Sequence, residues 1–286
     1  MPHLGLQMPS FTFEGVPNEA MFERIVETAL AAEQAGFDSF WVMDHYHQIP
    51  NVGAETEPML EAYTLLGGIA ARTSRIRLGT MVTGVTYRNP AFLAKVVTTL
   101  DIVSSGRAIL GIGAAWNEAE SRAYGYDWPP TAERFERLED ALQICRGMFT
   151  HERATFHGKR HRVEGAINVP QPVQPGGPKI LVGGGGERKT LRLTAQYADM
   201  WNGFGSVDDI RHKIEVLARH CGDVGRDPSD IVKTRLGTRI TEPDIVEVSR
   251  PFFEDAGLDG MLYGAGTGAT PDDVAEAGRA LRSAFG

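Results

Sequence analysis

One short segment, Asp44-His45-Tyr46-His47, combines a carboxylate with two imidazoles directly after an apolar run. These side chains could ligate a catalytic metal, but such a site needs at least three protein ligands. The other six histidines fall on expected helices, in an irregular segment or near the N-terminus, so no metal site is predicted. The segment favours His45 as a single proton donor, because an imidazole titrates near neutral pH. The alternative is that Asp44 only accepts backbone N–H groups and His47 is solvated.

A run of four glycines separates another apolar run from an expected helix; it consists of Gly183, Gly184, Gly185 and Gly186. Consecutive backbone N–H groups at a helix start bind anions, and Arg188 or Lys189 could add positive charge. The Gly-Lys-Ser/Thr ending of a nucleoside triphosphate loop is absent. The run predicts a phosphate cradle, with a plain flexible turn as the alternative.

Two further segments could meet a flat ligand. Residues 79–84 place two glycines beside Thr80, Met81, Val82 and Thr83, which would let a ring lie against backbone or form only a tight turn. Residues 111–118 include Trp116, which could wall a pocket or only pack. The same segment holds Asn117, which could hydrogen-bond the edge of a ring or only cap the next turn.

The elements that must position these residues alternate regularly. Apolar runs typical of buried parallel strands occupy residues 4–8, 39–43, 76–82, 108–112, 179–182, 199–202, 231–239 and 259–263. Amphipathic helices fall between them, with Asn18 and Thr131 as expected N-caps and Phe92 on an expected inward stripe. This order predicts a (β/α)8 barrel, in which reactive groups lie at the carboxyl ends of the strands. A doubly wound sheet is the alternative, but residues 8–11 lack the glycine-rich turn it requires.

Two local features refine this prediction. The pattern Glu-x-Ala-Gly-x-Asp occurs at residues 33–38 and again at 254–259, with a weaker copy at 198–199, so one helix-to-strand unit is reused. Residues 150–178 interrupt the rhythm with an expected hairpin and a stretch rich in proline and glycine. We interpret them as an excursion between the fourth helix and the fifth strand of a single domain, residues 1–286.

Composition excludes several classes of protein. The chain of 286 residues carries 29 basic and 37 acidic side chains, and a net charge of −8 argues against nucleic-acid binding. No apolar run approaches the roughly 20 residues that cross a bilayer, and no secretory signal is expected at the start. Only Cys145 and Cys221 are present, which excludes a disulfide framework and predicts a cytoplasmic location.

Taken together, these segments resemble the bacterial luciferase-like superfamily, in particular its oxidoreductases that depend on coenzyme F420. The matching stretches are residues 38–45, 76–82, 105–107 with 111–118, and 180–186 with 198–202. The resemblance implies a TIM barrel that holds coenzyme F420, or alternatively FMN, in its mouth. It also implies a homodimer and a small organic substrate.

By position, the resemblance assigns roles to individual residues. His45 would lie near the reactive carbon of the ring, and Asp44 would contact the ring or its hydroxylated chain. Met81 and Val82 match a non-prolyl cis peptide behind the ring. Asn117 matches a contact to the ring, and the four glycines match the phosphate loop. One departure is Ala114, because the sugar-phosphate dehydrogenases of this family carry glutamate there; oxidation of a sugar phosphate is therefore not expected.

The sequence supports four hypotheses. The first is an enzyme in which coenzyme F420 exchanges a hydride with a small organic substrate and His45 transfers the proton. The second is an FMN-dependent monooxygenase or reductase on the same fold, and the third is a flavin-binding protein without turnover. A metal-dependent hydrolase comes last. Trp41, Trp116 and Trp201 are expected near the barrel mouth, where they would report ligand binding.

Overall fold

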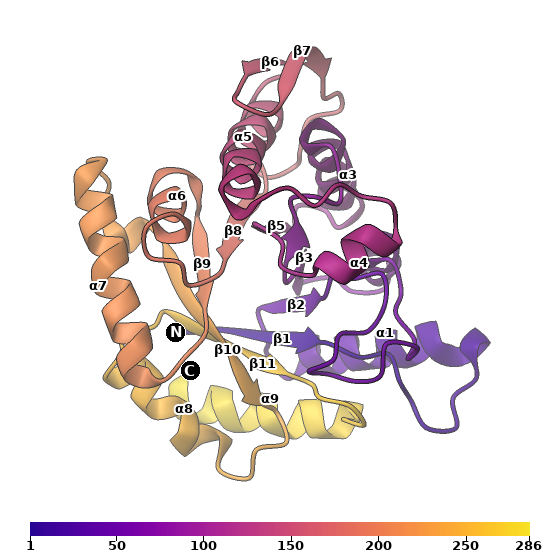
Figure 1. The fold of residues 1–286 in the computed structure, drawn as a ribbon. Helices are drawn as coiled ribbons and strands as arrows, with labels where there is room; N and C mark the ends of the chain where they lie inside the picture. Colours follow the sequence, from indigo (N-terminus) through magenta and orange to yellow (C-terminus); the bar gives the residue numbers. More distant parts are fainter.

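The computed structural model describes all residues, 1–286, and shows a closed barrel of eight parallel strands surrounded by helices (Figure 1). The barrel strands are β1 (His3–Met8), β2 (Ser39–Val42), β3 (Arg77–Thr80), β5 (Ala108–Gly113), β8 (Lys179–Gly183), β9 (Met200–Gly203), β10 (Val232–Arg239) and β11 (Gly260–Gly264). Pairing of β1 with β11 and of β3 with β5 closes the ring. The predicted (β/α)8 barrel is confirmed.

Nine α-helices accompany the strands, and most of them cover the outer face of the barrel (Figure 1). They are α1 (Asn18–Gln34), α2 (Ala62–Ala70), α3 (Pro90–Val103), α4 (Glu118–Ala123), α5 (Thr131–Thr150), α6 (Thr190–Tyr197), α7 (Val207–Asp223), α8 (Ile245–Glu254) and α9 (Pro271–Phe285). The expected caps Asn18 and Thr131 are wrong by one position. Each is the first helical residue, because the preceding proline takes the extended cap conformation. No helix combines the length and the apolar character that crossing a membrane requires.

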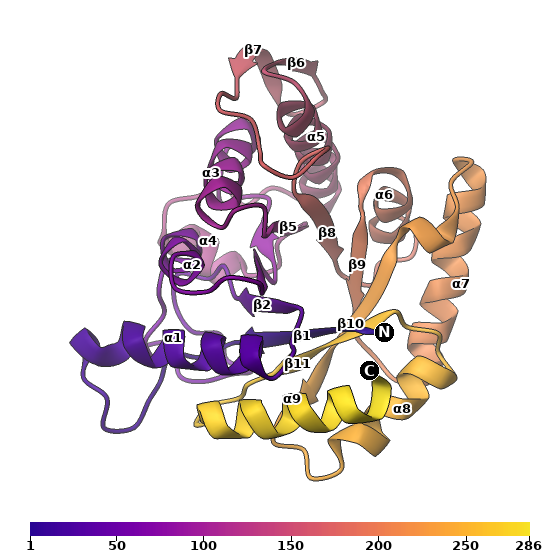
Figure 2. The same cartoon turned by 180° about the vertical axis from the view of Figure 1, so that it is seen from behind.

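The predicted excursion is an antiparallel hairpin that projects from the barrel (Figure 2). It consists of β6 (Arg153–His157) and β7 (Arg162–Ile167) and lies between α5 and β8. The Asp140 carboxylate on α5 accepts backbone N–H bonds from Lys159, Arg160 and His161 at the tip of the hairpin. This buried carboxylate fastens the turn of the hairpin to the helix that precedes it.

The repeated helix-to-strand pattern has a common structural function. Asp38, Asp199 and Asp259 each precede a strand, and each accepts the backbone N–H of the second residue of the preceding barrel strand, at 2.8 Å. A hydrogen bond to a charged acceptor contributes about 1.5–3 kcal/mol, so each aspartate fixes the register of a strand pair. These anchors lie at the amino ends of the strands, opposite the loops that carry the candidate functional residues.

The third predicted strand is interrupted where the candidate site begins. β3 ends at Thr80, the Met81–Val82 peptide bond is cis, and pairing resumes in the short strand β4 (Thr83–Gly84). The cis bond lies where the resemblance implies one. Met81 belongs to a small apolar cluster inside the barrel that also contains Trp41, and Val82 packs against it. Trp41 therefore lies in the barrel interior rather than near the mouth as expected.

Candidate active site

A cavity of about 320 Å³ opens at the carboxyl ends of the strands. Its lining comes from the segments after β2, β3, β5, β8 and β9, together with the start of α5. Of the residues singled out from the sequence, those that border the cavity are His45, Met81, Val82, Ala114, Trp116, Thr131, Gly183 and Gly184. Segments far apart in the chain thus meet at one mouth, as the barrel prediction requires.

The floor of the cavity is built around Val82. A Cβ atom added at Gly183 would lie 2.9 Å from Val82 Cγ1, and one added at Gly113 would lie 3.1 Å from Val82 Cγ2. Both distances are shorter than ordinary carbon contacts of about 3.5–4.0 Å. The two glycines therefore make room for the valine side chain, which forms an apolar platform at the base of the mouth.

His45 stands at the edge of this cavity and is held by a buried carboxylate. Its Nδ1 lies 2.7 Å from Glu120 Oε2, and Glu120 is completely buried in α4. The imidazole also meets Trp116 edge to face, with ring centroids 5.6 Å apart. The other ring nitrogen, Nε2, has no hydrogen-bond partner within the protein, so it is the one available to a ligand.

The Glu120 carboxylate also accepts hydrogen bonds from other donors. Tyr87 OH donates to Oε2, and the backbone N–H of Tyr46 donates to Oε1. Burial alone would raise the pKa of Glu120, but the bonds from His45 and Tyr87 outweigh it, so the pKa lies below its usual value. Burial and the Glu120 carboxylate together raise the pKa of Tyr87. This site therefore holds a carboxylate and a neutral phenol.

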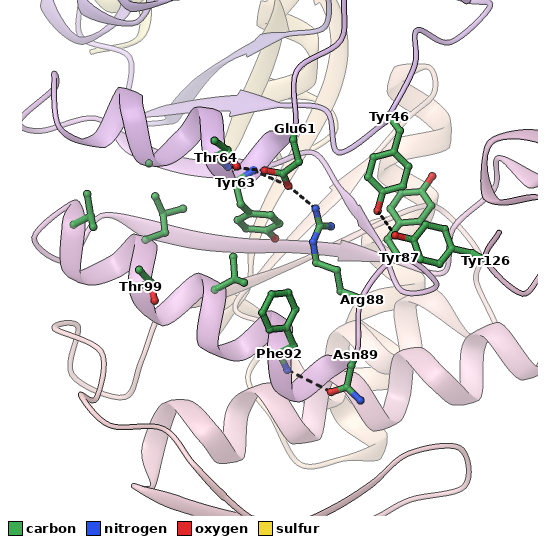
Figure 3. A pocket seen from close by; sticks show the side chains of 14 residues that line it. Tyr46, Glu61, Tyr63, Thr64, Tyr87, Arg88, Asn89, Phe92, Thr99 and Tyr126 are labelled. Atoms are coloured by element: carbon green, nitrogen blue, oxygen red, sulfur yellow. Dashed lines mark hydrogen bonds and ion pairs between the residues drawn. The ribbon is translucent and has the colours of Figure 1, made fainter. Parts of the chain in front are cut away.

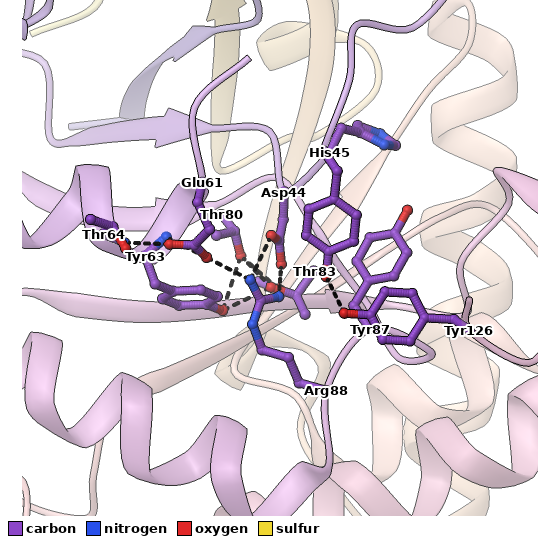
Figure 4. A network of polar contacts seen from close by, with 12 residues as sticks. Asp44, His45, Glu61, Tyr63, Thr64, Thr80, Thr83, Tyr87, Arg88 and Tyr126 are labelled. Atoms are coloured by element: carbon purple, nitrogen blue, oxygen red, sulfur yellow. Dashed lines mark hydrogen bonds and ion pairs between the residues drawn. The ribbon is translucent and has the colours of Figure 1, made fainter. Parts of the chain in front are cut away.

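Asp44, the neighbour of His45, points into a different environment (Figure 4). It is 1% exposed and pairs with both terminal nitrogens of Arg88, which also reaches Glu61. Burial works against the charge on Arg88, but the Asp44 carboxylate outweighs it and raises the pKa of the guanidinium. Asp44 does not border the cavity.

Asn117 also lies beside the cavity rather than in its lining. Its side chain accepts the backbone N–H of Glu120 and thereby caps α4, which is the alternative that the sequence left open. Whether Asp44 and Asn117 contact a cofactor stays a prediction.

The glycine run forms a loop between β8 and α6. Gly183 and Gly184 border the main cavity, whereas Gly185 and Gly186 line an adjoining recess with Arg188 and Lys189. The Lys213 side chain from α7 passes close to Gly185, because a Cβ there would lie 3.0 Å from Lys213 Cε. Three cationic side chains and one carboxylate, that of Glu187, thus lie around this loop, and the cations together with the loop N–H groups favour an anion.

The Trp201 indole nitrogen donates to the Gly184 carbonyl at 2.8 Å, so this side chain braces the loop although it is fully buried.

A second and larger hollow of about 720 Å³ runs between α2 and α3 (Figure 3). Arg88 and Tyr63 form its polar part, with the guanidinium 4.9 Å from the centre of the Tyr63 ring. Phe92 lies in the groove and is 60% exposed. The expectation that Phe92 faces inward is therefore wrong, because it belongs to a second apolar stripe on the outer side of α3.

Sequence reasoning missed Glu120, Tyr87 and Arg88. The spacing of Asn117 and Glu120 is that of a capping box, and it could have predicted the start of α4. In the structure, however, the Glu120 carboxylate turns away from the cap and bonds to His45. No group of three or more His, Cys, Asp or Glu side chains is arranged to hold a metal ion.

Comparisons with known proteins identify the family and the fold. Residues 4–284 match the sequence profile of luciferase-like monooxygenases. The chain is 37% identical over 169 residues to the F420-dependent glucose-6-phosphate dehydrogenase of Kineococcus radiotolerans, covering 58% of this chain and 48% of that protein. It is 33% identical over 212 residues to an uncharacterized protein of Mycobacterium tuberculosis, covering 70% and 74% respectively. The chain thus spans about half the length of the F420-dependent relatives it matches.

Solved structures share the fold over the whole chain. An F420-dependent secondary alcohol dehydrogenase superposes with a TM-score of 0.78 at 19% identity, covering 99% of this chain and 98% of that one. The coenzyme F420-dependent tetrahydromethanopterin reductase of Methanopyrus kandleri gives 0.81 at 16% identity, covering 100% and 99%. At such low identity these likenesses show the fold alone. With the profile match over nearly its full length, the chain belongs to the luciferase-like monooxygenase family.

Proposed function

We propose that the protein is an oxidoreductase that uses coenzyme F420 to exchange a hydride with a small organic substrate. The observation that carries the proposal is that His45, the Val82 platform and the first two glycines of the loop, Gly183 and Gly184, border one cavity. The curated relatives that depend on this coenzyme support the choice of cofactor.

The residues present fit such a group. The glycines at positions 113 and 183 leave Val82 as an apolar surface on which a flat ring system can lie. The loop from Gly183 to Gly186, with Arg188 and Lys213 nearby, would hold the phosphate of the cofactor side chain. Neighbouring parts of the barrel mouth would thus bind the ring and the phosphate of the cofactor.

When bound, the deazaflavin supplies or accepts the hydride. The chain's own task is to exclude water from the ring and to move a proton at His45 Nε2. General acid–base catalysis by a positioned imidazole contributes about 10²–10⁴-fold to rate. The structure thus supports His45 as the catalytic residue of the proposed reaction.

The cavity lining favours an uncharged substrate. It contains no aspartate or glutamate, and Ala114 borders it at the position where the resemblance places a glutamate in sugar-phosphate dehydrogenases. The only guanidinium, that of Arg134, already bonds to the carbonyls of Ala114 and Pro129 and to Thr131 Oγ1. We therefore propose a small alcohol or carbonyl compound rather than a sugar phosphate, and glucose 6-phosphate should be a poor substrate beside propan-2-ol or acetone.

Ligand titration tests the proposal directly. Trp116 borders the cavity and is 59% exposed, so its fluorescence should change when a ring binds. We expect coenzyme F420 to bind at least ten times more tightly than FMN. His45→Ala should lower turnover by about 10²-fold or more and leave the cofactor Kd within about twofold. The reverse preference would move the protein to FMN-dependent chemistry, and binding without turnover of any substrate would favour a flavin-binding protein.

We also propose that a second copy of this chain covers the groove between α2 and α3. Phe92 is 60% exposed there and Val103 is 47% exposed, and apolar side chains gathered in one hollow mark an interaction surface (Figure 3). Phe92→Asp should convert a homodimer into a monomer in light scattering. A wild-type monomer would contradict the proposal. The cytoplasmic location expected from the sequence stays a prediction.

A further inference from the structure

Glu120 is a buried charge that the cofactor site does not explain. It is 0% exposed and sits in the six-residue helix α4, which enters the mouth between β5 and α5. Taking a carboxylate out of water costs several kcal/mol unless donors surround it. Here the donors are His45, Tyr87 and the backbone N–H groups of Tyr46 and His47. The carboxylate therefore ties α4 to the segment after β2, which carries the catalytic imidazole.

The bond to His45 has a chemical consequence for the imidazole. A carboxylate can only accept hydrogen bonds, so the nitrogen that faces it must carry the proton. Nδ1 lies 2.7 Å from Glu120 Oε2, and the pKa of Glu120 lies below its usual value, so the acid is ionised near neutral pH. Neutral His45 is thus fixed as the Nδ1–H tautomer, with the lone pair on Nε2 facing the cavity.

The neighbours of this pair prevent the ring from turning. Trp116 meets one side of the imidazole edge to face, and Tyr87 donates to the same Glu120 oxygen that His45 uses. Rotation of the ring about its bond to Cβ would break the Nδ1 contact and leave a buried carboxylate with one donor fewer. Leaving such a group without its partner costs about 1–3 kcal/mol or more.

We propose that Glu120 is the positioning residue that holds His45 in its Nδ1–H tautomer and directs Nε2 at the substrate oxygen. In the reductive direction, the carbonyl carbon of the substrate would receive a hydride from bound, reduced coenzyme F420 as the C=O π bond breaks. The oxygen takes the proton from Nε2 of protonated His45, and the neutral Nδ1–H tautomer remains against Glu120. In the oxidative direction Nε2 accepts the alcohol proton. This role rests on the proposed function.

A merely structural role for Glu120 would be to hold α4 in place. The two roles differ in which side chains could replace Glu120. A structural anchor could be replaced by any acceptor of similar shape, whereas tautomer control requires an ionised group that cannot donate. Glutamine has the same shape but carries both a donor and an acceptor, so Glu120→Gln separates the roles.

The first experiment is ¹⁵N NMR of the histidine side chains in the full chain, with His45 assigned through His45→Ala. Wild type should show His45 as the Nδ1–H tautomer at a pH where it is neutral, and Glu120→Gln should show a mixture of tautomers. Tyr87→Phe removes another donor from the same carboxylate and should leave the tautomer as in wild type. A wild-type Nε2–H tautomer, or one that Glu120→Gln does not alter, would overturn the proposal.

The second experiment measures turnover with reduced coenzyme F420 and acetone as probe. Glu120→Gln should lower kcat by about tenfold to a hundredfold, part of the 10²–10⁴-fold that acid–base catalysis supplies, and leave the cofactor Kd within about twofold. Glu120→Asp keeps the charge and should recover part of the rate. Glu118→Gln is the matched control, because Glu118 lies on the same helix and pairs only with exposed Arg122. An unchanged kcat in Glu120→Gln would refute the positioning role.

The two experiments also separate this proposal from the proposed function. If coenzyme F420 does not bind, the proposed function fails, but the tautomer of His45 still decides whether Glu120 positions the imidazole. If Glu120→Gln proves unstable, the wild-type spectrum still decides the matter, because an Nε2–H tautomer of neutral His45 would overturn the proposal.

Discussion

The fit between Gly183 and Val82 allows the cofactor platform to be tested by a single methyl group. In Gly183→Ala the new Cβ would lie 2.9 Å from Val82 Cγ1 and 3.2 Å from Val82 Cγ2. Ordinary carbon contacts are about 3.5–4.0 Å, so the valine must move by roughly half an ångström. Gly113 closes the other side of the valine, which leaves the cavity as the direction of movement.

Because Val82 moves toward the cavity, the substitution should weaken cofactor binding more than it lowers the stability of the free protein. Without ligand, Val82 can move into open space, so the thermal midpoint of Gly183→Ala should stay near that of wild type. With ligand, the displaced methyl groups occupy the plane on which the ring would lie. Overpacking costs about 1–3 kcal/mol, so the cofactor Kd should rise about tenfold to a hundredfold in a fluorescence titration.

A double-mutant cycle makes the reasoning refutable. Val82→Ala removes both methyl groups that collide with the new Cβ, so Gly183→Ala should cost little affinity in that background. Gly222→Ala is the control, since Gly222 lies in α7 with nothing within 4 Å of an added Cβ. If the effects of Gly183→Ala and Val82→Ala on Kd are simply additive, Val82 is not the platform and the argument fails.

The remaining predictions concern stability. Glu33 accepts hydrogen bonds from the backbone N–H groups of Ser74, Arg75 and Ile76. Partial burial would raise the pKa of Glu33, but these bonds outweigh it and lower the pKa from 4.5 to about 2. Its stabilisation should be present above pH 4.5 and be lost as pH falls through about 2, a dependence that Glu33→Gln should remove in acid unfolding curves. Asp44→Asn should destabilise the protein by about 3 kcal/mol in urea, because it leaves Arg88 undercompensated, and should change the cofactor Kd less than Gly183→Ala does. Arg107→Leu should cost about 3 kcal/mol in urea, because buried carbonyl groups lose the guanidinium that donates to them.

The barrel could be predicted because its signals are local. Each strand is a short apolar run, and the repeated aspartates at positions 38, 199 and 259 mark the residue directly before a strand. Those aspartates act within one helix-to-strand unit and on the neighbouring strand, so the same sequence pattern produces the same bond each time. The glycine loop was predictable for the same reason, since four successive glycines specify an open backbone whatever surrounds them.

The direction of individual side chains could not be predicted in this way. Asp44 and His45 are adjacent in the sequence, yet one turns to Arg88 and the other to the cavity (Figure 4). Asp44 pairs with Arg88, 44 residues away, and His45 bonds to Glu120, 75 residues away. Neither spacing follows from helix or strand periodicity. Phe92 shows the same limit, because an apolar residue on a helix can face the core or a groove between helices.

Glu120 illustrates why a site is harder to predict than the fold that carries it. Its position three residues after Asn117 predicts a helix cap, and the backbone half of that cap does form. The carboxylate instead meets His45 and Tyr87, because closure of the barrel brings the loops after β2, β3 and β5 to one rim. A local rule would therefore have placed the residue on the correct element, but only the tertiary structure supplies its partner. If Glu120→Gln destabilises the protein without altering the His45 tautomer, the carboxylate only anchors α4. If the tautomer changes, α4 holds the carboxylate in the position from which it orients His45.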